Sequence, residues 1–185
     1  MRQLFLLMIL FSSVAVMAQN ERKHIRDSYK LYHDSLFEQA QEASVKAMAI
    51  NPDSYEANYN YANSLFKQQK YDEAIEKYSQ LASKETSKER LAQLYHNIGD
   101  CHFAKQEIEK SIEDFKKALK NNPLDHEARY NLVLAQKLLQ QQQQDQNQDQ
   151  QNQDQQKDQQ QQQQQQQQDQ NQMDKETAEQ ILQAL

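Results

Sequence analysis

Cys101 and His102 are the pair in this sequence that comes nearest to catalytic chemistry, because an imidazole beside a thiol can generate a nucleophilic thiolate. Adjacent residues of a helix point about 100° apart, so these two side chains cannot face each other. Cys101 also follows Ile98 by about one helical turn, on the side where we expect a core. The pattern therefore favours a buried, unreactive thiol over the alternative, an oxidative-stress enzyme that uses Cys101.

The histidines are scattered rather than grouped at metal-binding or haem-binding spacing. They occur in neither an H-E-x-x-H nor a C-x-x-C-H motif, and a single Cys can form no cysteine pair. The five are His24, His33, His96, His102 and His126. We therefore expect no catalytic residue, no metal site and no cofactor, and we predict that the protein is not an enzyme.

The composition predicts a helical protein and argues against one that binds nucleic acid. The chain has 185 residues with one Gly and two Pro, too few for the turns of a β-rich fold. Its formal net charge is −6, and the five Asp and one Lys of residues 140–172 supply −4 of this charge. The remainder is near neutral without a basic stripe, so we expect no nucleic-acid partner.

Residues 1–18 have the pattern of a secretory signal peptide. Arg2 precedes the apolar run Leu4–Phe11, and small residues lead to a cleavage site after Ala18. The run is shorter than the roughly 20 residues that a membrane span needs. We predict cleavage before Gln19 and an exported chain without a membrane span; an uncleaved N-terminal anchor is the alternative.

Two Asn-Pro sequences reveal an internal repeat. Pro52 and Pro123 each end an apolar-periodic segment, and they lie 71 residues apart, which is two periods of 34 plus three. Small or similar residues recur in the same register, with spacings of 34, 37 and 34, and so do the residues of a following helix. The first positions are Ser28, Ala62, Gly99 and Val133; the later ones are Ala40, Ala74, Ser111, then Ser44, Tyr78, Phe115, then Ala47, Leu81, Ala118.

This register resembles the tetratricopeptide repeat, in which a small residue of one helix lets a second helix cross closely. The segment YHNIGDCHFAKQEIEKSIEDFKKALKNNP carries the pattern most fully, whereas Ser28 and Ser44 depart from it and predict looser packing in the first repeat. The resemblance implies an all-α helical solenoid of three helix pairs plus a capping helix. The predicted parts are a tetratricopeptide domain over 19–139 (repeats 21–54, 55–88 and 92–125, capping helix 126–139), a disordered Gln/Asp/Asn-rich linker over 140–172, and a C-terminal amphipathic helix over 173–185.

In similar repeat proteins the first helix of each pair lines a concave groove that binds partners. The positions of this sequence that match are Tyr29, Tyr32, Tyr59, Asn60, Asn63, Phe66, His96, Asn97, Asp100, Phe103, Tyr130 and Asn131. Asn60, Asn97 and Asn131 share one register, and an amide side chain can bond a peptide backbone. The Lys and Arg that bind chaperone-tail carboxylates in related repeats are mostly replaced here, so we expect a different protein ligand.

The last thirteen residues predict a helix that needs a partner. Asp174 can act as an N-cap with Met173 as a hydrophobic staple, and one apolar stripe follows. The predicted docking residues are Met173, Ala178, Ile181, Leu182 and Leu185. A helix this short is marginal alone in water, so the linker is interpreted as a tether and the tail as a docking element.

The whole arrangement is similar to the BatC-type proteins of the aerotolerance (Bat) operon. The shared features are the signal peptide, the opening NERKHIRDSYKLYHD, three repeats, a polar tract and the ending AEQILQAL. The resemblance implies a periplasmic scaffold that mediates protein–protein interactions in an envelope complex with von Willebrand factor A-domain membrane proteins. The alternative is a self-associating or autoinhibited module whose C-terminal helix occupies its own groove.

Overall fold

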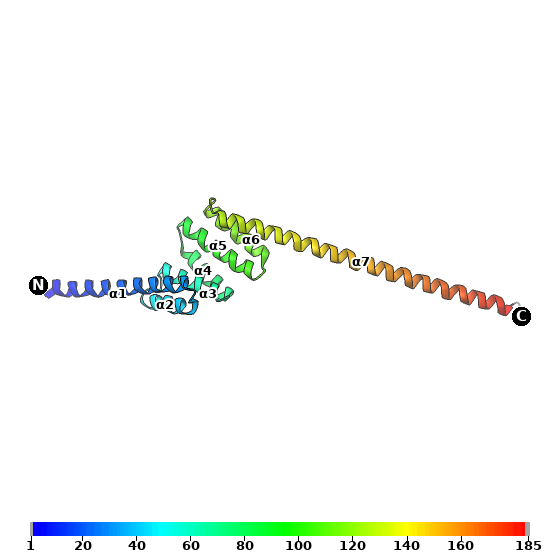
Figure 1. Cartoon of the computed structure of the whole chain (residues 1–185), viewed down its shortest axis with the longest axis horizontal. Helices are drawn as coiled ribbons and strands as arrows, with labels where there is room; N and C mark the ends of the chain where they lie inside the picture. The colour runs from blue at the N-terminus through cyan, green and yellow to red at the C-terminus, as the bar shows by residue number, and fades with distance from the viewer. Residues whose placement is uncertain (1, 184–185) are drawn as a thin grey trace. The chain divides into compact units, whose positions relative to one another are not determined.

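The computed structural model describes the backbone of residues 2–183 and the side chains of residues 17–148, with scattered further side chains up to residue 170. Every element in this range is a helix (Figure 1). The helices are α1 (Arg2–His33), α2 (Phe37–Ile50), α3 (Tyr55–Lys67), α4 (Tyr71–Lys84), α5 (Lys88–Ala104), α6 (Ile108–Asn121) and α7 (His126–Gln183). The predicted all-α class is confirmed.

The first six helices form three pairs, α1 with α2, α3 with α4, and α5 with α6. Neighbouring pairs contact each other through α2 against α3 and through α4 against α5. Only residues 85–87 connect α4 to α5, and Ser87 caps α5 by accepting a hydrogen bond from the Arg90 amide. The three extra residues of the third repeat therefore lengthen the start of α5, which begins before the predicted repeat boundary at residue 92.

The small residue of each first helix faces the middle of its second helix, as the register predicts. In the third pair, a Cβ built on Gly99 would lie 2.6 Å from Cε1 and 2.7 Å from Cδ1 of Phe115. Such distances are far inside van der Waals contact, so only Gly fits beside this ring in its present position. Phe115 itself is fully buried.

The first pair fills the same place with two hydroxyl groups. Ser28 and Ser44 are both fully buried, and their Oγ atoms lie 2.6 Å apart. The Ser44 hydroxyl is also 3.1 Å from the Ala40 carbonyl oxygen, which can accept its hydrogen bond. The predicted looser packing is not seen at this crossing, because the two small side chains meet each other directly.

The turn within each pair uses a left-handed residue that is not Gly. Ser35, Gln69 and Gln106 have φ of 61°, 62° and 61°. In each turn the next residue closes back on the helix; for example, the Lys70 amide donates to the Leu65 carbonyl over 3.0 Å. This is the Schellman pattern, in which Gly is the usual left-handed residue.

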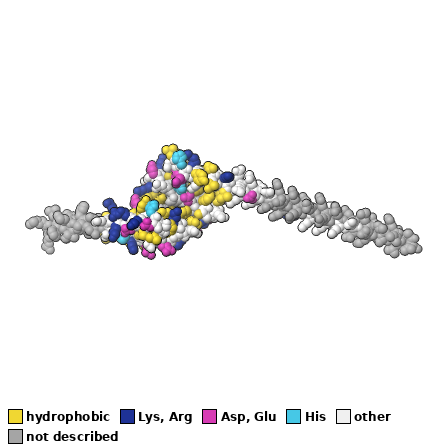
Figure 2. All heavy atoms as spheres, in the orientation of Figure 1, with side chains coloured by type: hydrophobic (Ala, Val, Ile, Leu, Met, Phe, Trp, Pro, Cys, Tyr) yellow, Lys and Arg dark blue, Asp and Glu magenta, His cyan; other side chains and the backbone are white. Residues whose placement is uncertain are grey.

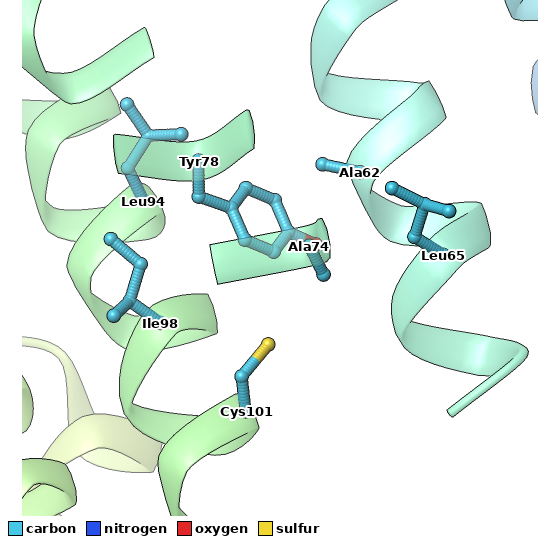
Figure 3. Packing of buried hydrophobic residues seen from close by; sticks show 7 residues of the cluster. All are labelled: Ala62, Leu65, Ala74, Tyr78, Leu94, Ile98 and Cys101. Carbon is cyan, nitrogen blue, oxygen red and sulfur yellow. The ribbon is translucent and has the colours of Figure 1, made fainter. Parts of the chain in front are cut away.

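The middle of the solenoid is packed around Tyr78 of α4. Figure 3 shows its ring between Ala62 and Leu65 of α3 and the side chains of Leu94, Ile98 and Cys101 of α5. Since the ring is 1% exposed and touches neighbours from two pairs, it joins the second repeat to the third.

The chain divides into two compact units, residues 1–137 and residues 138–185. The start of α7 belongs to the first unit and acts as the predicted capping helix: Ala128 and Ala135 are fully buried, and the Asn131 amide donates to Asp100 of α5. Its outer side is less polar than a terminal repeat usually presents, because Tyr130 and Val133 are exposed.

The second unit is helical as far as Gln183, so α7 includes residues 140–172, for which the sequence predicts no fixed structure. Gln is a fair helix former, which favours extension of a helix already started at His126. The helix also passes Asp174 without a new start. The side chains of the predicted docking residues Met173, Ala178, Ile181, Leu182 and Leu185 lie outside the described residues. Among the residues that the structure describes, no helix has the length and apolarity to cross a membrane.

Candidate functional site

A cavity of about 230 Å³ opens on the side of the solenoid formed by the first helices. It is bordered by α1, α3 and α5, with one side chain reaching it from α4. Its lining consists of Tyr32, Tyr59, Asn63, Phe66, Lys67, Tyr78, Asn97 and Asp100. The structure thus brings together six of the predicted groove residues, from three successive repeats.

Hydrogen bonds hold the polar end of the cavity. The Tyr78 hydroxyl donates to Oδ1 of Asn63 over 2.6 Å. The Asn97 amide donates to the Tyr59 hydroxyl at 3.0 Å and, more weakly, to Oδ1 of Asn63 at 3.4 Å. Because these residues come from α3, α4 and α5, the network fixes the cavity wall across the boundary between two repeats.

The tyrosines of the cavity stay protonated near neutral pH. Burial raises the pKa of Tyr32 and of Tyr59 above the ordinary value. It raises the pKa of Tyr78 well above that value. A protonated phenol can both donate and accept a hydrogen bond. The cavity therefore presents rings and neutral hydroxyls to a ligand, next to the Lys67 ammonium and the Asp100 carboxylate.

The three asparagines that share one register bond back to the preceding repeat. Asn60 points its amide toward the Ile25 carbonyl of α1 at the long distance of 3.5 Å. Asn97 donates to α3 as described, and Asn131 donates to Oδ1 of Asp100 on α5 over 3.0 Å. Such amides can bond a peptide backbone; in this structure their N–H groups join successive first helices.

His96 lies outside the cavity lining, between two carboxylates. Its Nε2 is 3.4 Å from Asp100 and its Nδ1 is 3.4 Å from Asp125, while its ring meets the Phe115 ring edge to face. The hydrogen bond with Asp100 is the main cause that raises the pKa of His96, and Asp125 adds to it, whereas burial opposes the shift.

The other predicted groove residues are more dispersed. Tyr29 is exposed and packs on the His33 ring, with centroids 4.3 Å apart. Phe103 is half-buried on α5, and Tyr130 is exposed on α7. None of the three lines the cavity.

Two cavity residues were not predicted. Tyr78 is a register position of a second helix and was not among the predicted groove residues; its ring lies in the core, but its hydroxyl reaches the cavity. Lys67 is the last residue of α3, next to Phe66, and its ammonium lies 5.7 Å from the centre of the Phe66 ring. Its position one residue after a groove aromatic is the signal that could have identified it.

Cys101 is poorly suited to nucleophilic chemistry in this structure. It has no exposed surface, and burial, with a further contribution from Asp100, raises its pKa to about 12. The thiolate is the reactive form, so both properties disfavour reaction. In the part of the chain that is described, no group of three or more His, Cys, Asp or Glu could hold a metal ion.

Comparison with known proteins finds matches to part of the repeat region. The family model described as "Tetratricopeptide repeat" matches residues 53–123. A curated relative, the "BBSome complex member BBS4 homolog" of Drosophila melanogaster, is 41% identical over 63 residues. That alignment spans 34% of this chain and 12% of the relative, so the two proteins share a short repeat region.

Solved structures of similar fold include complexes with peptides. The second TPR domain of human RPAP3 with the HSP70 peptide SGPTIEEVD has a TM-score of 0.58 at 18% identity, covering 65% of this chain and 98% of that one. The first TPR of Spaghetti (RPAP3) bound to the HSP90 peptide SRMEEVD has a TM-score of 0.60 at 21% identity, covering 65% and 94%. The TPR2AB-domain:pHSP90-complex of yeast Sti1 has a TM-score of 0.62 at 19% identity, covering 67% and 49%. These likenesses show the fold.

Proposed function

From the premise that residues 53–123 belong to the tetratricopeptide repeat family and that the chain has its fold, we propose that this protein is an exported adaptor that binds a protein segment in its groove. Tetratricopeptide domains mediate protein–protein interactions, as the peptide-bound structures of similar fold illustrate. The observation that carries the proposal is the cavity shared by α1, α3 and α5.

The chemistry of the cavity favours a ligand that buries one apolar or aromatic side chain. The rings of Tyr32, Tyr59 and Phe66 line a volume of about 230 Å³, and aromatic side chains give large contact area at a low entropic cost. Asn63 and Asn97 lie beside them and can orient the polar backbone of a bound segment. Lys67 adds a positive charge at the rim, which favours an acidic residue next to the buried side chain.

We further propose that the adaptor works in the periplasm, with von Willebrand factor A-domain membrane proteins as its partners. The proposal is supported by the signal-peptide pattern of residues 1–18 and by the resemblance of the whole chain to aerotolerance-operon proteins of the BatC type. In the second candidate function, the C-terminal segment of the chain occupies the groove and blocks it. Its apolar stripe, Ala178 to Leu185, supports this alternative.

Site-specific photo-crosslinking in the native envelope tests the adaptor. One chain carries a photoreactive phenylalanine analogue in place of Phe66, which lines the cavity, and a control chain carries it in place of Val45, an exposed residue of α2 outside the cavity lining. We expect the first chain to capture a von Willebrand factor A-domain protein and the control to capture none. Capture of the chain's own residues 173–185 by position 66 would instead favour the blocked groove.

Reversing the charge of Lys67 tests quantitatively whether the cavity rim contributes to partner binding. Lys67→Glu places the opposite charge at the cavity rim, and Lys120→Glu makes the same change at an exposed residue of α6. We expect the first variant to weaken partner capture severalfold and the second to leave it unchanged. Equal capture by both variants would refute the proposed role of the groove.

Sequencing the N-terminus of the protein isolated from its native cells tests the export step. We expect the mature chain to begin at Gln19. A chain in the membrane fraction that keeps residues 1–18 would favour the alternative of an uncleaved anchor.

A further inference from the structure

The first turns of α7 carry an apolar face that no helix covers among the residues that the structure describes. Val133 has the register of Ser28, Ala62 and Gly99, all of which are buried beneath the second helix of their own pair. Val133 is 59% exposed, and Tyr130 and Leu134 beside it are 69% and 41% exposed. Figure 2 shows hydrophobic side chains gathered at the start of α7. Within the described residues, the fourth repeat therefore has a first helix and no second helix packed on it.

The residues that follow Val133 along the chain cannot provide that second helix. In the complete repeats, the helix positions 12, 16 and 19 residues after the small residue are apolar or small; in the second repeat they are Ala74, Tyr78 and Leu81. The same offsets from Val133 fall on Asp145, Asp149 and Asn152. Burying two carboxylates against an apolar face is costly, so this segment does not complete the repeat.

The missing pattern occurs at the C-terminus. Ala178, Leu182 and Leu185 have the spacing of four and then three residues that Ala74, Tyr78 and Leu81 have in α4. The charges are also complementary. Residues 174–179 contain three acids and one Lys, a sum of −2, whereas Arg129 and Lys137 flank the apolar face.

We propose that the C-terminal segment of a second copy of this chain packs on the exposed face of α7 and completes the fourth repeat. In the second unit, the helix from Leu138 to Gln183 is about 68 Å long at 1.5 Å per residue, so residue 178 cannot return to residue 133 of its own chain while this helix persists. When the tail of one chain packs antiparallel to the exposed face of the other, residue 178 lies beside residue 133, and residue 181 beside residue 130. Each copy offers one face and one tail, so the pairing closes as a twofold dimer.

Molar-mass measurement by light scattering over a series of protein concentrations tests this dimer. We expect the full mature chain to be dimeric. Val133→Asp places a charge in the face and Leu182→Asp places one in the tail; each should raise the dissociation constant about tenfold or more. Because Val133 is exposed, its substitution leaves the repeat fold intact, which the helical signal in circular dichroism and the thermal transition will verify. Gln183→Asp, adjacent to Leu182 on the polar side of the tail, is the matched control and should remain dimeric.

Mixing the two variants distinguishes pairing between chains from folding back within one chain. The Val133→Asp chain keeps an intact tail and the Leu182→Asp chain keeps an intact face, so an equimolar mixture should form a heterodimer through one interface. A monomeric full chain, or variants as dimeric as the full chain, would overturn the proposal, as would a mixture that stays monomeric. Lys67→Glu should not alter the molar mass, so failure of the dimer and failure of the groove proposal are separate results.

Discussion

In the third helix pair Gly99 leaves room for the ring of Phe115, whereas in the first pair Ser28 and Ser44 meet as two hydroxyl side chains 2.6 Å apart. The second pair, with Ala62 and Tyr78, is of the same kind as the third. All of these positions are buried, so a close crossing of two helices does not require one particular pair of residues. It requires that the two side chains together fill the space and that any buried polar atom finds a partner.

The largest expected effect on stability comes from truncating the buried side chain that the second helix places at the crossing, which is Phe115 in the third pair and Ser44 in the first. Phe115→Ala removes a fully buried ring and leaves a cavity beside Gly99, which should cost about 3–5 kcal/mol of unfolding free energy. Ser44→Ala leaves the Ser28 hydroxyl without that partner and should cost about 1–2 kcal/mol. Urea unfolding followed by circular dichroism measures both, with Lys120→Ala on the exposed side of α6 as a neutral control. Equal losses at positions 115 and 44 would contradict the comparison.

The next effect tests whether the glycine is required by the ring. Gly99→Ala should destabilise the protein by about 1–3 kcal/mol, because the added Cβ would collide with Phe115, although Ala is the better helix former. Combined with Phe115→Leu, the same substitution should cost much less, since the smaller side chain withdraws from the contact. A double-mutant cycle measures this coupling. Ser28→Ala in the first pair adds no atom, so it should show no such steric coupling to position 44.

A smaller effect should be common to all three pairs, because they share the same turn. Ser35→Gly, Gln69→Gly and Gln106→Gly each relieve a left-handed residue and should stabilise the protein by about 0.5–1 kcal/mol. Gln68→Gly is the matched control for position 69. Its φ is −82°, so Gly gains nothing there and loses the hydrogen bond to Gln41. Thermal unfolding would reveal an opposite result as a lowered midpoint in the turn variants.

The smallest expected effect belongs to the third pair, where His96 meets the Phe115 ring. The folded-state pKa of His96 is raised above its ordinary value of 6.5, so its contribution to stability is fully present below pH 6.5 and is lost as the pH rises through the folded pKa. We expect the urea midpoint to fall slightly as the pH is raised from 6.5 through that higher folded-state pKa. His96→Gln should reduce this fall; an unchanged pH dependence in the variant would assign it to other groups.

The repeat register predicted the helix pairs well, because a small residue recurring every 34 or 37 residues has a direct steric meaning at a helix crossing. It could not predict the pairing of Ser28 with Ser44, since a family pattern records residue size more readily than hydrogen bonding across a crossing. The scarcity of Gly correctly predicted helices. It gave no sign of the turns in which Ser35, Gln69 and Gln106 adopt the left-handed conformation, which lowers stability for a residue other than Gly.

The groove was predicted in part for a similar reason. Register places Tyr59, Asn63 and Asn97 on one side of the first helices, and these residues do line the cavity. Register alone does not show whether an amide faces solvent or a neighbouring helix, which depends on the rise from one repeat to the next. Register also does not show that one side chain can belong to two sites: the ring of Tyr78 packs in the core, while its hydroxyl lies at the cavity.

The asparagines that join successive first helices would couple the proposed binding of a protein segment to the angle between neighbouring repeats. Asn97 donates to α3 across the second and third repeats, and Asn131 donates to α5 across the third and fourth. A bound segment that replaces the hydrogen bonds of Asn97 removes a restraint on the angle between the second and third repeats. A segment that leaves these bonds in place binds to repeats held at a fixed angle. We therefore expect the affinity of the proposed groove to include an elastic contribution, which alanine substitution of Asn97 would expose even where the ligand never touches that side chain.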